Sequence, residues 1–139
     1  MLEGTVIAAI VTYLLMLAAF YLHRLRTLHG PVMIAVILFD IGMPFYLMMN
    51  RDWGKRLIDE GDIMSFGIWM HFGLIITLYV LYAVQIQTAL VLRKAAGETQ
   101  PEDALKARRD HRMQAKGILL ARALVILTGG ILVESPELE

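Results

Sequence analysis

The sequence contains no cysteine, and this absence excludes several kinds of site at once. Disulfides, thiolate metal sites, iron–sulfur clusters and covalently attached c-type haem all require cysteine. Charged residues are also few, at 19% of the chain against roughly 25% in an average soluble domain. The 13 basic and 13 acidic residues cancel, so no net positive charge points to a nucleic-acid partner. The candidate ligands for a metal or cofactor are therefore the four histidines, the nine methionines and a few carboxylates.

Long apolar segments are what the sequence has in abundance, since 58% of its residues are hydrophobic. Four such segments occupy about 4–22, 30–49, 63–92 and 113–133. Each approaches or exceeds the roughly 20 residues that a helix needs to cross about 30 Å of hydrocarbon. We therefore predict an all-α integral membrane four-helix bundle that takes up residues 1–139 as a single domain and is surrounded by membrane lipid.

The positions of the basic residues predict the orientation of the bundle. Lysine and arginine near the ends of membrane spans are preferentially retained in the cytoplasm. The segment 23–29 carries Arg24 and Arg26, and the segment 93–112 carries a larger basic group. We therefore expect both segments to be cytoplasmic loops of a multi-pass protein of the cell inner membrane, with both termini on the non-cytoplasmic side.

The second and fourth spans share a spacing of polar residues. Both spans run outward from the cytoplasm, and they begin with His29 and His111, which we therefore expect at one depth. Eleven residues further along stand Asp40 and Arg122. Eleven residues make about three helical turns and a rise of roughly 16 Å, so each charge lies above its histidine on the same helix face. Because a charge in hydrocarbon is costly, we predict that Asp40 and Arg122 pair across the bundle.

A third histidine, His71, lies eight residues inside the third span and is predicted to join Asp40 and Arg122 in an intramembrane polar cluster. One interpretation of this cluster is structural, namely a buried salt bridge that fixes the helix register. The other is a proton path or a site for a quinone headgroup. A nearby arginine keeps a carboxylate ionised, so His71 is the better proton donor of the three.

The pair of histidines at the inner rim suggests a b-type haem. Such a haem needs two imidazoles on facing helices, an apolar slot and cations near its propionates. His29 and His111 are the candidate axial ligands. The candidate propionate partners are the nearby arginines, namely Arg24, Arg26, Arg108 and Arg112. Histidine at a helix start is also common as a mere interfacial residue, so this pattern alone leaves both interpretations open.

Copper is the alternative cofactor, because neutral imidazole suits copper as well as iron. His23, His29 and His111 could form a three-histidine site at the cytoplasmic rim. The methionines do not decide the matter, because methionine in apolar helices is usually a packing residue.

Short motifs around the histidines resemble a known family. The motifs are His29-Gly-Pro-Val-Met, His71-Phe-Gly-Leu, and His111-Arg with Lys116 and Thr128-Gly129. They are similar to a small four-helix bacterial membrane family of once-unknown function that includes a factor needed to mature haem-copper cytochrome oxidases. The spacing also resembles cytochrome b-561-type ferric reductases, although His71 lacks the opposite histidine that a second haem requires. This second resemblance implies one haem, not two.

These patterns lead to a first hypothesis about function. We expect a membrane b-type haem protein that transfers electrons, as a small subunit or partner of a larger redox complex or oxidase. The alternatives are an assembly factor that handles haem or copper for a haem-copper oxidase, and a structural subunit without cofactor. No substrate pocket is evident in the sequence, which favours a non-catalytic protein over an enzyme.

Overall fold

The computed structural model describes residues 2–22, 24–50, 62–98 and 101–134. Within these residues four helices follow one another: α1 (Leu2–Tyr21), α2 (Arg26–Asn50), α4 (Asp62–Glu98) and α5 (Pro101–Glu134). Each contains a stretch long and apolar enough to cross a membrane, and these stretches are Gly4–Tyr21, Thr27–Met49, Phe66–Lys94 and Glu102–Leu132. The predicted all-α class and the four candidate spans are thus confirmed for the described part of the chain.

Three of the predicted helix boundaries were wrong, two of them by many residues. The third helix continues to Glu98 and the fourth begins at Pro101, so the described residues of the predicted loop 93–112 are helical. Similarly, α2 begins at Arg26, inside the predicted loop 23–29. Hydropathy detects the part of a helix that suits hydrocarbon and misses its polar continuation. Alanine, lysine, arginine and glutamate favour helix in water, and Pro101 suits a first helical position.

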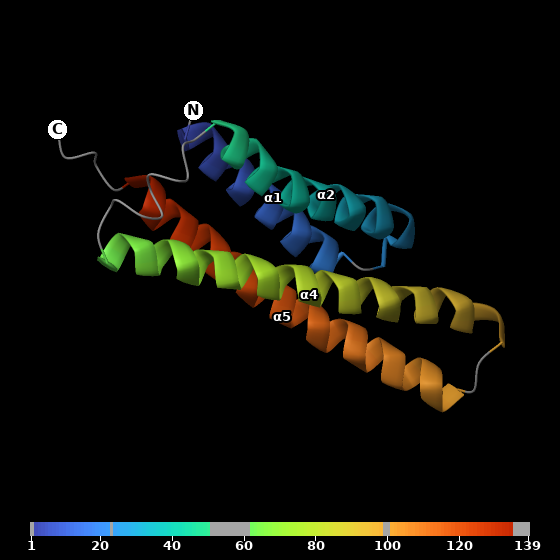
Figure 1. Cartoon of the computed structure of the whole chain (residues 1–139). Coiled ribbons are helices and arrows are strands. Elements are labelled where there is room, and N and C mark those ends of the chain that lie inside the picture. The colour runs from blue at the N-terminus through green and yellow to red at the C-terminus, as the bar shows by residue number, and fades with distance from the viewer. Residues whose placement is uncertain (1, 23, 51–61, 99–100, 135–139) are drawn as a thin grey trace.

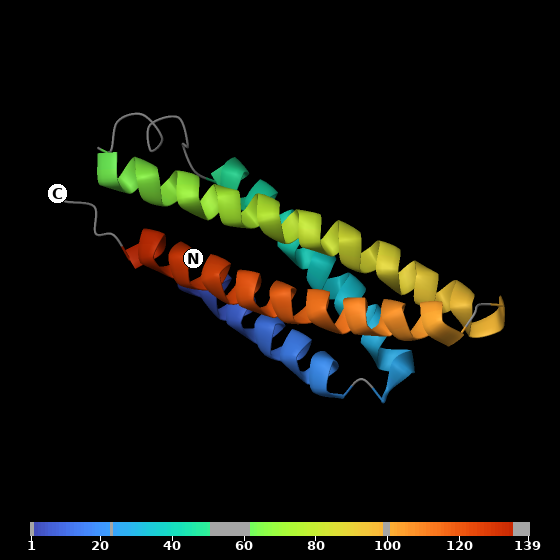
Figure 2. The same ribbon diagram turned by 90° about the horizontal axis from the view of Figure 1, so that it is seen from below.

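The helices form two antiparallel hairpins, α1 with α2 and α4 with α5 (Figure 1). The α4–α5 pair has the most extensive contact, and α1 packs against both α2 and α5. The start of α1 and the end of α5 lie at the same end of the molecule. At the other end, α4 and α5 extend well beyond the turn that joins α1 to α2, and the view from below shows the same projection (Figure 2). The projecting part is hereafter the α4–α5 arm.

The buried core is small and lies where all four helices meet. It consists of six side chains, one from α1, one from α2 and two each from α4 and α5, namely Met16, Val36, Leu78, Tyr82, Ile118 and Ala121. Large apolar side chains elsewhere on every helix are exposed, as in Leu14, Leu38, Val80 and Leu127. An apolar exterior around a polar-containing interior is the arrangement that a bilayer requires. The structure is therefore consistent with a multi-pass membrane protein.

Pro44 interrupts the hydrogen bonding of α2, and a tyrosine of α4 compensates for the interruption. A proline inside a helix has no N–H to donate to the carbonyl four residues earlier, which here is that of Asp40. The hydroxyl of Tyr79 donates to this carbonyl oxygen at 2.9 Å. The bond satisfies a backbone acceptor that would otherwise lie unpaired in apolar surroundings, and it ties α2 to α4 at the level of Asp40.

We predict that Tyr79→Phe lowers the free energy of unfolding by about 1 kcal/mol, the usual net value of one hydrogen bond. In a Pro44→Ala background the same change should cost clearly less, because the restored N–H of residue 44 donates to the Asp40 carbonyl. Reversible unfolding in mixed micelles of detergent and SDS measures both values. Equal losses in the two backgrounds would show that Tyr79 does not act through this carbonyl.

Candidate functional site

Asp40 and Arg122 form the predicted ion pair at the centre of the bundle. Nε of Arg122 donates to Oδ2 of Asp40 at 2.8 Å, and Nη2 donates to Oδ1 at 2.7 Å. The side chain of Arg122 is only 2% exposed and that of Asp40 only 12%. A two-pronged, charge-assisted contact of this kind is among the strong hydrogen-bonded arrangements in proteins. The pair joins α2 to α5.

Side chains from the other two helices complete the surroundings of this pair. Tyr82 of α4 donates its hydroxyl hydrogen to Oδ2 of Asp40. Thr12 of α1 accepts a hydrogen bond of 2.7 Å from Nη2 of Arg122, while its own hydroxyl donates to carbonyls of the preceding helical turn. Each helix thus contributes one polar group. Of the Arg122 nitrogens, Nη1 is buried without a hydrogen-bond partner among the described residues.

Thr12 and Tyr82 were not among the residues that the sequence pattern predicted for this cluster. Each is a hydroxyl-bearing residue in an otherwise apolar stretch. That signal is ambiguous, because threonine in a helix can satisfy its hydroxyl on its own backbone and tyrosine is common at membrane interfaces. Only the packing of the four helices brings these two hydroxyls to the charged pair.

His71 does not take part in the cluster that the sequence predicted for it. Its Nδ1 bonds to the hydroxyl oxygen of Thr128 at 2.7 Å. A Cβ at Gly129 would come within 3.1 Å of the His71 ring, so the small residue there permits the close approach. His71 precedes Tyr82, which marks the level of Asp40 on α4, by eleven residues, a distance of roughly 16 Å along the helix. The depth prediction failed because it assumed that α4 starts level with the end of α2. Tyr82, which lies beside Asp40, is 20 residues after the start of α4 at Asp62, whereas α2 continues only 10 residues beyond Asp40 to Asn50.

His29 and His111 face one another at the level of the α1–α2 turn. Their ring centroids are 6.3 Å apart, and the ring planes are inclined by 65°. Nδ1 of His29 lies 3.1 Å from the carbonyl oxygen of Ala19. Since a carbonyl only accepts, Nδ1 of His29 carries the hydrogen in this bond, and Nε2 keeps a lone pair that can bind a metal.

Gln85 is the closest polar neighbour of His111. The side-chain nitrogen of Gln85 lies 3.3 Å from Nε2 of His111, and Gln85 is 6% exposed. Oε1 of Gln85 and Nδ1 of His111 are buried without a hydrogen-bond partner among the described residues. If the amide donates to Nε2, the contact uses the same lone pair that a metal would need. A metal on Nε2 of His111 would therefore have to displace Gln85.

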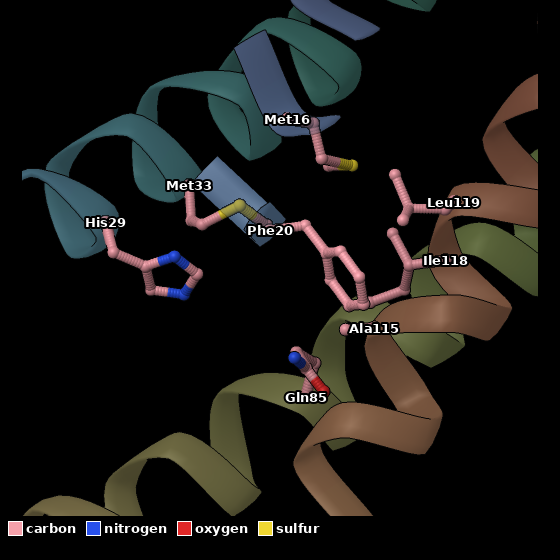
Figure 3. Close-up of a pocket in the computed structure, with 8 residues that line it drawn as sticks. All are labelled: Met16, Phe20, His29, Met33, Gln85, Ala115, Ile118 and Leu119. Atoms are coloured by element: carbon pink, nitrogen blue, oxygen red, sulfur yellow. The ribbon is translucent and has the colours of Figure 1, made fainter. Parts of the chain in front are cut away.

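A pocket adjoins His29 between the two hairpins (Figure 3). It is lined by His29, Gln85 and six apolar side chains, namely Met16, Phe20, Met33, Ala115, Ile118 and Leu119. Figure 3 shows Nε2 of His29 turned toward the side on which Gln85 lies, and the sulfur atoms of Met16 and Met33 near the space between the helices. The cavity volume is about 20 Å³, enough for one water molecule or a single ion.

The arginines proposed as propionate partners are distributed unevenly around this site. Arg24, Arg108 and Arg112 are exposed, and the side chain of Arg26 lies outside the described residues. Arg108 stands three residues before His111, on nearly the same face of α5, whereas Arg112 is about 100° further round the helix. Arg108 is therefore better placed than Arg112 to approach a group held by His111.

The three-histidine copper site cannot be assembled from the described residues. His23 lies outside them, and within them no group of three or more histidine, cysteine or acidic side chains is positioned to hold a metal ion. Among the described residues, the candidate metal ligands are therefore the facing imidazoles of His29 and His111, with the thioethers of Met16 and Met33 beside His29.

Comparisons of the chain with protein-family models, curated proteins and solved structures gave no match. The function of the site therefore has to be argued from its geometry.

For the ion pair, we predict that Arg122→Leu alone destabilises the protein by roughly 3–5 kcal/mol, because the buried carboxylate of Asp40 loses its counter-charge. The double variant Asp40→Asn/Arg122→Leu should lose much less, since no unpaired charge remains. Unfolding in mixed micelles and accumulation in the membrane fraction measure both. A double variant as unstable as the single one would count against charge pairing as the source of stability.

Proposed function

We propose that this protein is a membrane electron carrier that holds one b-type haem between His29 and His111. The observation that supports the proposal is the mutual orientation of the two imidazoles on α2 and α5. On this proposal the protein acts as a small subunit or partner of a larger membrane redox complex. His29 and His111 are the axial ligands, and the candidates for the propionates are Arg24, Arg26, Arg108 and Arg112, of which Arg108 is better placed than Arg112.

The separation of the rings fits a metal bound between them. A metal–nitrogen distance of about 2 Å on each side, plus roughly 1 Å from each nitrogen to its ring centre, puts the two centroids about 6 Å apart. The observed value is 6.3 Å. The carbonyl of Ala19 also suits metal binding by His29. A hydrogen bond to the ring nitrogen that does not bind the metal fixes the tautomer and the orientation of a ligating histidine.

The volume beside the ligands sets a condition on haem binding. Ligand pockets usually measure about 300–1,000 Å³, whereas the pocket beside His29 measures about 20 Å³. The ring separation of 6.3 Å suits a metal ion, but the pocket has no room for a macrocycle, so haem binding would require lining side chains such as Phe20 and Gln85 to move aside while the two histidines keep their spacing. Gln85 would have to leave Nε2 of His111 at the same time.

Once bound, a haem supplies one-electron redox chemistry, which the side chains of this region lack. The contribution of the chain is to hold and orient the ligands. Ala19 fixes the imidazole of His29, and the apolar residues Met33 and Ile118 limit the access of water to the centre, which affects its potential.

A copper-handling assembly protein is the second candidate function, and a separate observation favours it. The pocket has room for a single ion, and the thioethers of Met16 and Met33 line it together with His29. Met33 follows His29 by four residues, so both lie on one face of α2. Thioether and imidazole together suit copper(I). In this function the protein would hold the ion for delivery to an oxidase and would catalyse no reaction.

The visible spectrum of the detergent-purified protein tests the first proposal. We expect a sharp Soret band and a reduced alpha band at one haem per chain. His111→Ala should abolish these bands, whereas the matched change His71→Ala should leave them in place. If the reverse holds, the ligand assignment is wrong.

Metal analysis of the same preparation tests the second proposal. One copper per chain without a Soret band, lost in Met33→Leu and retained in Met43→Leu, would support copper handling and contradict haem binding. A preparation with neither haem nor copper, also after incubation with each, would overturn both proposals and leave a structural subunit.

A further inference from the structure

One face of α5 changes from basic to apolar along its length. The helix turns through 100° per residue, so side chains three or four positions apart share a face. Lys116, Leu120, Leu124, Leu127 and Ile131 follow one another at this spacing. All five are exposed, and Leu120 and Leu127 are more than 60% exposed. The row points away from the core, because Ile118, Ala121 and Arg122 form the buried face of the same segment.

The basic end of this row is broadened by three arginines. Arg108, Arg109 and Arg112 are exposed and lie one to two helical turns before Lys116. Arg112 and Lys116 are four residues apart and thus adjacent on the helix surface. The face of α5 formed by these four cations and by Leu120, Leu124, Leu127 and Ile131 is hereafter the α5 ridge.

We propose that the α5 ridge binds an anionic phospholipid at the inner surface of the membrane. Its four cations would contact the phosphate of the headgroup, and an acyl chain would lie along Leu120, Leu124 and Leu127. Arg108 is also a candidate propionate partner, so the test below replaces only Arg112 and Lys116 and does not depend on the metal centre.

The dimensions of the ridge agree with those of a lipid. From Lys116 to Leu127 the helix rises by eleven residues, roughly 16 Å. One leaflet of a bilayer contributes about 15 Å of hydrocarbon, half of the total of about 30 Å. From Lys116 to the end of α5 at Glu134 the rise is about 27 Å, close to the whole hydrocarbon thickness. The change from basic to apolar residues thus falls where headgroups meet acyl chains.

Charge complementarity favours an anionic lipid over a zwitterionic one. A cluster of four to eight basic residues immediately cytoplasmic of a membrane span is the pattern that recognises anionic headgroups. Acidic residues are few on this face, since Asp110 points about 160° away from Arg112 around the helix. Long basic side chains can also bend toward the headgroups while their stems cover apolar surface.

The test compares lipids and matched variants on the full-length protein purified in a neutral detergent. Thermal unfolding and native mass spectrometry are recorded with phosphatidylglycerol and with phosphatidylcholine of the same chain length. We expect a retained phosphatidylglycerol adduct and a higher melting temperature, because a ligand that binds the folded state stabilises it. The double variant Arg112→Gln/Lys116→Gln should bind phosphatidylglycerol roughly 30-fold more weakly.

The control is Arg93→Gln/Lys94→Gln, which removes the same charge from exposed positions of α4. It should bind phosphatidylglycerol as the wild type does. An equal loss of phosphatidylglycerol binding in both variants would show that binding depends on overall charge and would contradict a specific site on the α5 ridge. Unchanged binding in the α5 variant would overturn it as well. Equal stabilisation by inorganic phosphate, or by a short-chain phosphatidylglycerol, would show that the apolar part of the ridge takes no part.

Discussion

One buried contact, that between Asp40 and Arg122, brings polar groups of all four helices together. Two charges in apolar surroundings are tolerated only when each is paired and hydrogen-bonded. This requirement brings a carboxylate of α2, a guanidinium of α5, the hydroxyl of Tyr82 from α4 and that of Thr12 from α1 to one place. Apolar contacts alone do not set such a register, because the apolar exterior of each helix can pack in many rotations.

The same register brings the two histidines together. His29 and His111 each precede a member of the ion pair by eleven residues, which returns the helix to almost the same face. Because α2 and α5 also run in the same direction (Figure 1), the imidazoles lie on the same side of each helix as the paired charges, about three turns away, and their rings are 6.3 Å apart. Whether iron, copper or no metal lies between them, their juxtaposition follows from the ion pair. The register set by the ion pair thus helps to position the two histidines.

Pro44 shows how the bundle tolerates an irregular helix at this level. The carbonyl that the proline leaves without an internal donor belongs to Asp40 itself and is satisfied by Tyr79. Asp40 is therefore bound through both its side chain and its backbone to the opposite hairpin. In contrast, the α4–α5 arm projects beyond α1 and α2 (Figure 1). Its contacts are those between α4 and α5, such as the burial of Ala107.

The sequence by itself determined the helical class, the four candidate spans and the pairing of Asp40 with Arg122, because each depends on composition or on spacing within one helix. It did not determine where α4 ends and α5 begins, since hydropathy does not detect the polar continuation of a helix. Nor did it place His71, because position along a long helix gives depth only when its partner helix is known. The hydroxyls of Thr12, Tyr79 and Tyr82 and the contact of Gln85 with His111 depended on tertiary structure. Their partners lie on other helices, and only the packing of those helices decides which polar groups meet.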